Sequence, residues 1–379
     1  MGNLERIDFK TRDPLMHRRK LVVLSLPTSF GGGEFYLKRL TELLKAESDI
    51  VICSTDVGGL LEGLAESGAT IVRFNNSTWI HARWNLLVWA WCARRALRKP
   101  GVLILYNGIG PAYFAPILWG FLRVKGVLIA HTPTSLWRGL LRRSVLFVVR
   151  RFLAAVIGVS DTVAADISGF WPGMAVFSIP NWLSPAEFVV QDGCRARGKA
   201  AEIVSVVVAS RLAPGKGIEH VLSVCADLPA ILRLDVYGDG QLLPILRGRY
   251  GHMSHIQFHG MVTDIQRRLK SHDILITASS IDTFSYSTAE GILHGLLCVV
   301  TKTSVFRELL GDDYPESLMF NYGDEVDLLR AISCARNLLF AEGKYVDRVI
   351  AQAQLRIQGR NNSIVAKRNF DRFFMLMCK

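Results

Sequence analysis

A recurring order of short apolar run, loop and helical segment constrains the fold of this chain more than any other feature. Such runs occupy residues 21–26, 49–54, 70–74, 102–106 and 126–131, then 203–209 and 273–277, with further strand-and-turn segments at 234–240 and 256–262. Runs this short indicate buried strands, and helical segments between strands are typical of a parallel sheet. We therefore expect an α/β protein.

The length of the chain predicts more than one domain. Its 379 residues are too many for one ordinary core, and half of them are hydrophobic, which is enough to bury two. Residues 183–200 contain glycine and several charges and are typical of an interdomain linker. We place the first domain at 1–182 and the second at 183–358, and we expect a final helix in 359–379 to pack through an apolar stripe.

The segment after the run 273–277 combines acids with hydroxyl side chains. Asp282 lies in a loop rich in Ser and Thr, and Glu290 lies inside the small-residue helical segment that follows. A helix N-terminus offers N–H groups and the positive end of a dipole, which favour an anion. Acids on either side suit sugar hydroxyls, so this segment predicts a site for phosphate and sugar.

Two cations follow the run 203–209. Arg211 and Lys216 are five residues apart on a loop that contains glycine and proline. Such a pair can hold a diphosphate from two sides, Arg through its planar fork and Lys as a point charge. Two solvated loop cations are the alternative.

Together these segments resemble the retaining GT-B glycosyltransferases of family 4, the glycosyl transferases group 1. The family signature is an acid, seven residues, a Glu, and then a small-residue helix with Gly, which here are Asp282, Glu290 and Gly295. Asp282 stands where the family usually has Glu, and Leu297 stands where it usually has Pro. The resemblance extends from residue 21 to residue 374.

The resemblance implies a GT-B fold, in which two Rossmann-like domains face each other across a cleft. The first domain would bind the acceptor and the second the nucleotide sugar, with the final helix returning to the first. By this correspondence Glu290 binds the ribose, Asp282 the sugar, and Arg211 and Lys216 the diphosphate. The resemblance also places His131 beside the donor sugar and assigns donor binding to Gly31, Gly32, Gly33, Val262, Phe284, Ser285, Tyr286, Ser287 and Thr288.

The first domain has weaker signals of its own. Glycines 31–33 follow the first apolar run and would let the backbone approach a ligand, although a tight turn explains them equally well. They match neither a dinucleotide fingerprint nor a Walker loop. His131 ends the run 126–131, where α/β sheets place ligands, although a lone histidine is more often a packed residue.

Charge is distributed unevenly along the chain. The formal net charge is +12, and no acid occurs from residue 67 to residue 160, where thirteen Lys or Arg lie. Such a field implies an anionic partner. Trp137, Arg138, Arg142 and Arg143 suit a membrane-surface element, with ordinary core helices as the alternative. We expect an anionic membrane surface as partner, no nucleic acid, and peripheral attachment at the inner, cytoplasmic face of a membrane.

Cysteine and histidine patterns do not predict a metal site. The seven cysteines are scattered without a Cys-x-x-Cys, which indicates no disulfide framework and suits a reducing cytosol. His252, His255 and His259 suggest zinc, but no carboxylate or cysteine is spaced to complete a site. No apolar stretch reaches the roughly 18 residues that span a bilayer, and the first apolar run is too short for a signal peptide. We expect no metal or other cofactor, because the nucleotide sugar is itself a substrate.

We therefore expect a retaining glycosyltransferase. It would move a sugar from a nucleotide-sugar donor to a glycan or lipid-linked acceptor in cell-surface polysaccharide or glycolipid assembly. A GT-B epimerase or phosphorylase is one alternative, which product analysis would distinguish. A non-catalytic basic binding module is another, which nucleotide-sugar binding would distinguish.

Overall fold

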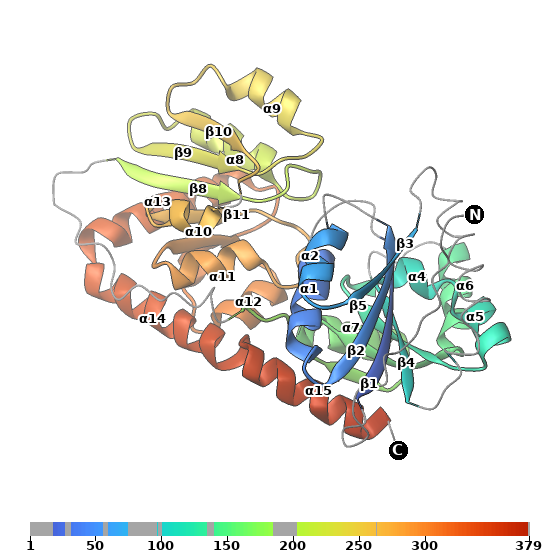
Figure 1. The fold of residues 1–379 in the computed structure, drawn as a ribbon. Helices are drawn as coiled ribbons and strands as arrows, with labels where there is room; N and C mark the ends of the chain where they lie inside the picture. Colours follow the sequence, from blue (N-terminus) through green and yellow to red (C-terminus); the bar gives the residue numbers. More distant parts are fainter. Residues whose placement is uncertain are drawn as a thin grey trace. The chain divides into compact units, whose positions relative to one another are not determined.

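The computed structural model describes residues 18–26, 32–55, 60–74, 97, 101–134, 140–184, 203–262 and 264–377. The chain forms two units (Figure 1). Unit 1 contains Met1–Asn181 and Ser363–Lys379, and unit 2 contains Trp182–Asn362. The units thus divide at 181/182 and 362/363, where the sequence-based boundaries are 182/183 and 358/359.

Unit 1 is built on a parallel sheet whose described strands have the order β3-β2-β1-β4-β5-β6-β7. The strands are β1 (Arg19–Ser25), β2 (Ser48–Thr55), β3 (Thr70–Phe74), β4 (Val102–Asn107), β5 (Gly126–Ala130), β6 (Leu153–Gly158) and β7 (Val176–Ser178). Its helices are α1 (Gly32–Leu44), α2 (Leu60–Glu66), α4 (Ile109–Ala112), α5 (Ala115–Leu122), α6 (Leu140–Arg150), α7 (Asp161–Phe170) and α15 (Ser363–Met377).

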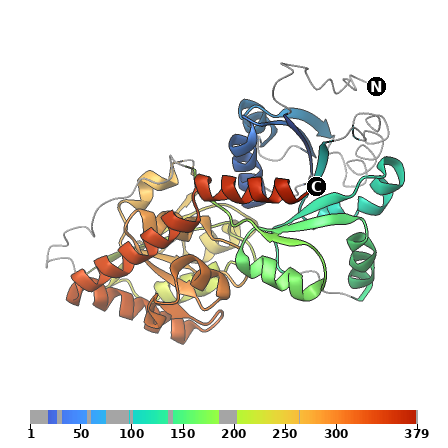
Figure 2. The same cartoon turned by 90° about the horizontal axis from the view of Figure 1, so that it is seen from below.

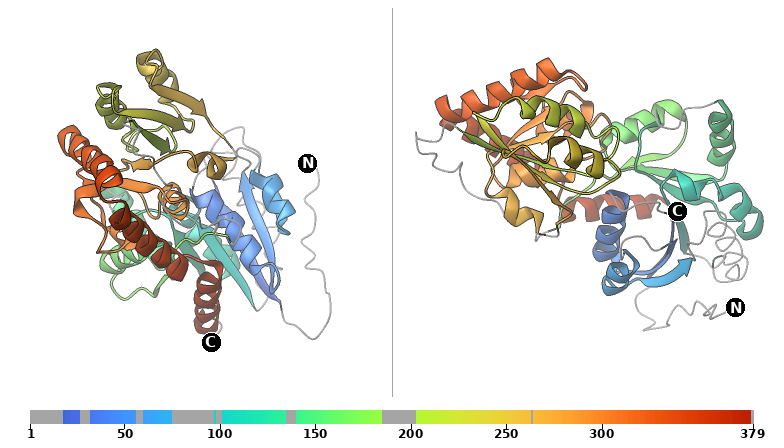
Figure 3. Two further views of the ribbon diagram at one scale, coloured as in Figure 1. Left: turned by 90° about the vertical axis from the view of Figure 1, so that its left-hand side faces the viewer. Right: turned by 90° about the horizontal axis from the view of Figure 1, so that it is seen from above.

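Both faces of this sheet are covered, which explains why its strands are uninterrupted apolar runs. Val22 of β1 shares a core cluster with Leu118 of α5 and Ile167 of α7. Val23 points to the opposite face, because side chains alternate along a strand, and it is also fully buried. Figures 2 and 3 show helices on both sides of the sheet.

The final helix, α15, packs into unit 1 through its apolar stripe. Phe370, Phe373 and Phe374 are buried, which confirms the predicted core packing, whereas Met377 is only half-buried. The Arg19 guanidinium lies over the Phe374 ring, 4.6 Å from its centroid.

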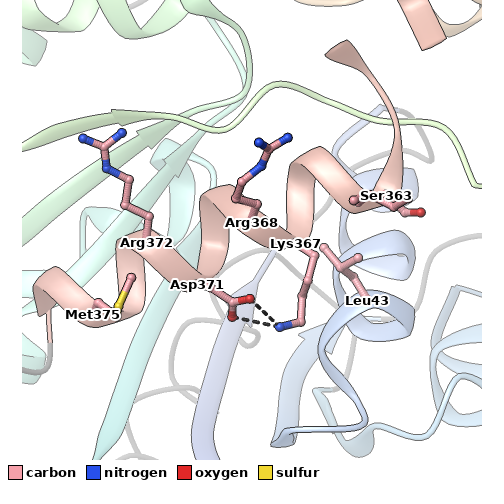
Figure 4. A pocket seen from close by; sticks show the side chains of 8 residues that line it. Leu43, Ser363, Lys367, Arg368, Asp371, Arg372 and Met375 are labelled. Carbon is pink, nitrogen blue, oxygen red and sulfur yellow. Dashed lines mark hydrogen bonds and ion pairs between the residues drawn. The ribbon is translucent and has the colours of Figure 1, made fainter. Parts of the chain in front are cut away.

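A groove of about 810 Å³ runs along α15 beside Leu43 of α1 (Figure 4). At its edge Lys367 Nζ donates to both carboxylate oxygens of Asp371, at 2.8 and 2.7 Å. Arg368 and Arg372 point away from that pair. None of the residues lining this groove belongs to the predicted site.

Unit 2 is built on a second parallel sheet, whose described strands have the order β10-β9-β8-β11-β12-β13. The strands are β8 (Val204–Ala209), β9 (Leu232–Tyr237), β10 (Ile256–Gly260), β11 (Ile274–Thr277), β12 (Leu297–Thr301) and β13 (Met319–Phe320). Its helices are α8 (Ile218–Ala226), α9 (Leu243–Tyr250), α10 (Ile265–Leu269), α11 (Tyr286–Leu293), α12 (Ser304–Leu310), α13 (Glu325–Ala341) and α14 (Gly343–Arg360), with a short 3-10 turn at Glu316–Leu318. These two parallel sheets with flanking helices confirm the predicted α/β fold.

Each sheet changes its winding direction beside its first strand. In unit 1 the chain places β2 and β3 on one side of β1 and then β4 on the other, and unit 2 repeats this with β8, β9, β10 and β11. Because crossovers between parallel strands are right-handed, the helices of the two halves cover opposite faces. Open α/β sheets bind ligands beyond the carboxyl ends of the strands at this position. The loops after β8 and β11, which carry Arg211, Lys216 and Asp282, begin there.

No helix among the described residues is both long enough and apolar enough to cross a membrane.

We predict that Gly238→Ala destabilises unit 2 and that Gly248→Ala does not. Gly238 has φ of +136°, and a Cβ there would overlap the Ser210 carbonyl oxygen, so the cost is at least about 1–3 kcal/mol. Gly248 lies exposed in α9, and a Cβ there meets nothing, so alanine adds roughly 0.5–1 kcal/mol of helix stability. Urea unfolding measures both changes, and equal free energies of unfolding for the two variants would contradict the predicted packing.

Candidate functional site

The loop after β8 is packed directly against the loop after β11. Gly217 has φ of +67°, and a Cβ there would overlap the carbonyl oxygen of Ala278. The Gly215 carbonyl accepts hydrogen bonds from the Ser280 backbone N–H at 2.9 Å and from its hydroxyl at 3.1 Å. Lys216 lies between these two glycines, so its backbone position is fixed by both loops.

A chain of buried hydroxyls fixes the start of α11. The Thr288 hydroxyl oxygen lies 2.8 Å from that of Ser285 and 2.9 Å from that of Thr277. Ser285 has φ of +63°, a left-handed conformation that costs energy for a residue other than glycine, and its bond to Thr288 helps to hold it there. Thr301 donates to the Ser279 carbonyl at 2.7 Å and so fixes the other end of the loop.

Lys216 and Asp282 form an ion pair. The Lys216 Nζ lies 2.8 Å from Asp282 Oδ1, and the two side chains are 23% and 16% exposed. The sequence analysis assigned these residues to separate parts of a ligand, and the structure brings them into contact. An incoming anion can therefore compete with Asp282 for Lys216.

The other predicted residues of unit 2 lie on the same two loops, on α11 and after β10. They are Arg211, Val262, Phe284, Tyr286, Ser287 and Glu290. Arg211 is exposed, whereas Ser287 and Glu290 are half-buried in α11. Phe284 is buried and packs edge-on against Tyr286, with the ring centroids 4.8 Å apart. Val262 packs against the core of unit 2.

His131 of unit 1 ends a polar chain at the carboxyl edge of its sheet. Its Nε2 lies 2.7 Å from Asn107 Oδ1, and Asn107 Nδ2 donates to the Ser25 hydroxyl at 3.1 Å. Because the amide oxygen is an acceptor, Nε2 carries the hydrogen. The ring packs edge-on against Tyr36, and burial lowers the pKa of His131 to about 4. The imidazole is therefore neutral near neutral pH.

Comparison with known proteins gives the family of unit 2 and the fold of the chain. Residues 204–336 match the family model described as glycosyl transferases group 1. No protein of curated function matches the sequence. Residues 204–336 form a glycosyl transferases group 1 domain.

The whole chain is similar in structure to solved glycosyltransferases with the GT-B fold. HepE of Anabaena, in complex with UDP and glucose, has a TM-score of 0.76 at 17% identity over 94% of this chain and 100% of that one. Sucrose-phosphate synthase of Thermosynechococcus elongatus has a TM-score of 0.75 at 16% identity over 95% and 99%. A TarM variant of S. aureus, in complex with fondaparinux, alpha-GlcNAc-glycerol and UDP, has a TM-score of 0.71 at 10% identity over 94% and 99%. These similarities confirm the predicted GT-B fold.

Several predicted residues fall outside the described part of the chain. Gly31, Trp137 and Arg138 lie there, whereas Arg142 and Arg143 lie in α6 with undescribed side chains. Gly32 begins α1, and Gly33 lies against the His131 ring, since a Cβ on it would be 3.7 Å from the ring.

The three histidines that suggested zinc do not converge. His255 Nε2 lies 3.1 Å from the Cys225 carbonyl oxygen, whereas His259 contacts Asp235. His252 is exposed. The described residues contain no cluster of three or more His, Cys, Asp or Glu side chains that could hold a metal ion.

Two polar features of this protein were missed by the sequence analysis. Asn107 joins β1 to His131, and its place directly after the predicted strand 102–106 was the available signal. Asp235 of β9 contacts two histidines, His259 and His272. A carboxylate inside a predicted strand was the signal there, but spacing does not reveal its partners.

We predict that His131 remains neutral well below the ordinary histidine pKa of about 6.5. The histidine rings can be labelled with ¹³C and followed by NMR, and the signal that is absent from the His131→Gln spectrum is that of His131. In the wild-type protein the titration midpoint of this signal should lie near 4. The unfolded chain takes up this proton at higher pH than the folded chain does, so the histidine reduces stability as the pH falls from about 6.5 to about 4. A midpoint near 6.5 would contradict the neutral ring.

Proposed function

We propose that this protein is a retaining glycosyltransferase that moves a sugar from a nucleotide-sugar donor to a glycan or lipid-linked acceptor. Its setting would be the assembly of a cell-surface polysaccharide or glycolipid. The observation that carries this proposal is the Lys216–Asp282 ion pair, which lies at 2.8 Å within the group 1 domain. Lys216, a cation suited to a diphosphate, and Asp282, an acid suited to sugar hydroxyls, are in contact at this position.

The loops after β8 and β11 would together bind the donor. Lys216 and Arg211 would hold the diphosphate, and the start of α11 would offer N–H groups to it. Glu290 would accept hydrogen bonds from the ribose, and Val262 would lie against the base. Complexes of HepE and TarM with UDP support a uridine nucleotide as the first donor to test.

The reaction would depend on charge that develops as the donor breaks. In the free protein Asp282 neutralises Lys216, and a bound diphosphate would take Lys216 and release Asp282 to a sugar hydroxyl. As the bond from the anomeric carbon to the diphosphate breaks, negative charge grows on the leaving phosphate. The two cations then stabilise the transition state more than the ground state, so no metal is required in this role.

Retention would follow if the acceptor attacks from the face that the diphosphate leaves. The leaving phosphate oxygen would take the proton of the acceptor hydroxyl as the new glycosidic bond forms. By the family correspondence the neutral His131 would lie beside the donor sugar, and its Nε2–H is oriented by Asn107. No protein nucleophile is needed for this course.

We also propose that unit 1 attaches to an anionic membrane surface at the cytoplasmic side. α6 exposes Val145, Phe147 and Val148, whose exposed fractions are 43%, 62% and 52%. The neighbouring α5 exposes Ile117, and the whole stretch from 67 to 160 has no acid. Apolar side chains among cations suit a membrane interface, and each cation near the surface contributes about 1 kcal/mol.

We predict that Lys216→Ala and Arg211→Ala each lower turnover at least tenfold, because each removes a charge-assisted contact of about 1.5–3 kcal/mol.

We predict that Asp282→Asn raises the affinity for a nucleoside diphosphate several-fold, because Lys216 loses its competing partner, and that it reduces transfer. A thermal-shift screen of UDP-, GDP- and ADP-sugars selects the donor. Calorimetry then measures the affinity for the nucleoside diphosphate, and a transfer assay measures turnover.

Arg233→Ala is the matched control for the two cation variants. Arg233 is an exposed cation near the start of β9, at the opposite edge of the sheet, so its loss should leave binding and turnover unchanged. Wild-type rates in folded Lys216→Ala and Arg211→Ala would contradict the diphosphate assignment. Unchanged transfer in Asp282→Asn would mean that this acid does not contact the sugar.

We predict that the protein sediments with anionic liposomes and that high salt weakens this binding. Phe147→Glu should reduce it strongly, because a charge replaces an exposed apolar side chain among cations. Changing Arg138, Arg142 and Arg143 to Glu should have the same effect.

Ile245→Glu is the control for Phe147→Glu, because Ile245 is a 67% exposed apolar residue of unit 2. It should leave liposome binding unchanged. Equal recovery in the supernatant with neutral and anionic liposomes at low salt would show that the positive charge serves another partner.

A further inference from the structure

Ser285 is the residue at which the loop after β11 turns into α11, and its backbone is strained. Its φ of +63° lies in the left-handed region, and among the described residues Arg123 is the one other residue with a positive φ that is not glycine. A side chain makes this conformation costly, so the surrounding structure has to supply the free energy that holds it. The contacts of Ser285 therefore decide whether the turn keeps its shape.

The hydroxyl of Thr288 is the polar partner of Ser285. Its oxygen lies 2.8 Å from Ser285 Oγ and 2.9 Å from Thr277 Oγ1. Thr277 ends β11, which pairs with β8 on one side and with β12 on the other. All three residues are buried, so water cannot readily replace a lost partner. The Thr288 hydroxyl therefore ties the strained turn to the central strands of the sheet.

Apolar packing gives the turn a second support, which has to be separated from the first. Phe284 is buried in the core of unit 2, and its ring packs edge-on against that of Tyr286, with the centroids 4.8 Å apart. These rings hold the residues on either side of Ser285. The hydroxyl bond, in contrast, acts on the strained residue itself.

The conformation of Ser285 determines how the acidic loop lies relative to α11. Asp282 precedes Ser285 in the loop, and Glu290 follows it in the helix. The Ser285 carbonyl also accepts a hydrogen bond in the first turn of the helix, from the Ala289 N–H at 3.1 Å. Because Ser285 joins the two parts, a rotation about its backbone would move Asp282 relative to Glu290 and would disturb the contact of Asp282 with Lys216.

We propose that the Thr288 hydroxyl positions the donor site by holding Ser285 in its left-handed conformation. The bond keeps Asp282 and Glu290 at a fixed separation, so that both contact one donor at the same time. Thr288 is a positioning residue, because its side chain is fully buried and has no direct contact with a donor in this role. The role rests on the proposed nucleotide-sugar binding.

Thr288→Val tests the hydroxyl with little change of shape. The probes are UDP-glucose, GDP-mannose and ADP-glucose, and the one that binds the wild-type protein most tightly is carried forward. Calorimetry should show an affinity about fivefold or more below that of the wild type, the factor that corresponds to one neutral hydrogen bond. Thr288→Ser keeps the hydroxyl and should therefore keep most of the wild-type affinity.

Glycine at position 285 separates positioning from a general loss of stability. Glycine adopts a positive φ without support, so Ser285→Gly should bind the donor as the wild type does. Ser285→Ala keeps the strain and loses the bond, so it should bind as weakly as Thr288→Val. In the Ser285→Gly protein, Thr288→Val should no longer lower the affinity, because no strained serine remains for the hydroxyl to hold. An equal loss of affinity from Thr288→Val in both backgrounds would overturn the proposal.

Amide hydrogen exchange at Ala289 measures the turn without any donor. Thr288→Val should speed the exchange of this N–H, because the Ser285 carbonyl that accepts from it loses its fixed direction. The N–H of Leu246 in α9, which donates to the Leu242 carbonyl at 2.9 Å, should exchange at the wild-type rate. Unchanged exchange at Ala289 would mean that the hydroxyl does not hold the turn, and the proposal would be overturned.

Thr41→Val is the matched control variant. Thr41 is also a fully buried threonine in a helix, and its hydroxyl donates to the Leu37 carbonyl at 2.9 Å. It bonds a regular helix and not a strained turn, so its replacement should leave the donor affinity and the exchange at Ala289 unchanged. A similar loss of affinity in Thr41→Val would show that the loss of any buried hydroxyl weakens binding, which would also overturn the proposal.

Failure of this inference is distinguishable from failure of the proposed function. If the wild-type protein binds a donor and Thr288→Val binds it equally well, the positioning role is overturned and the proposed function stands. If Thr288→Val does not fold, Ser285→Ala and Ser285→Gly decide, because equal affinities of these two variants would overturn the role. Failure of all three nucleotide sugars to bind the wild-type protein overturns the proposed function itself, and donor positioning with it.

Discussion

Backbone packed directly on backbone at the carboxyl edge of the second sheet is the constraint on which the rest of unit 2 depends. A Cβ at Gly217 would overlap the Ala278 carbonyl, and one at Gly238 would overlap the Ser210 carbonyl. The loops after β8, β9 and β11 therefore approach each other with no side chain between them. As a result, Lys216 and Asp282 emerge from fixed backbone and meet without reaching across solvent.

The sequence predicts most of this architecture because apolar burial on both faces leaves a strong local signal. The run 203–209 is β-rich and uninterrupted, and it forms the central strand β8. Arg211 and Lys216 were placed on a loop after that strand by the same local reading. The ion pair of Lys216 was not predictable, because Asp282 is 66 residues away and only the tertiary approach of two loops brings them together.

Local irregularities were equally beyond the sequence. Regular alternation along residues 255–259 would place His255 and His259 on one face of the strand. The bulge at His259 instead adds a residue and directs its ring to Asp235 and Tyr237. Ser285 gives no sign of its left-handed conformation, because the strain is supported by Thr288 and Thr277 from neighbouring elements. Such features depend on packing that no local window of sequence contains.

The Lys216–Asp282 pair also explains how an acid shorter than the usual Glu can occupy this position. A largely buried lysine without a partner would be costly, and Asp282 provides the counter-ion at 2.8 Å. Pairs that remain partly exposed typically contribute only about 0–1 kcal/mol, less than the roughly 1.5–3 kcal/mol of a charge-assisted contact to a ligand. In the proposed function, a diphosphate carries two charges against one on the carboxylate, so exchange of partners at Lys216 would be favourable. The pair can therefore help to order the two loops and, in the proposed function, would give way to a donor.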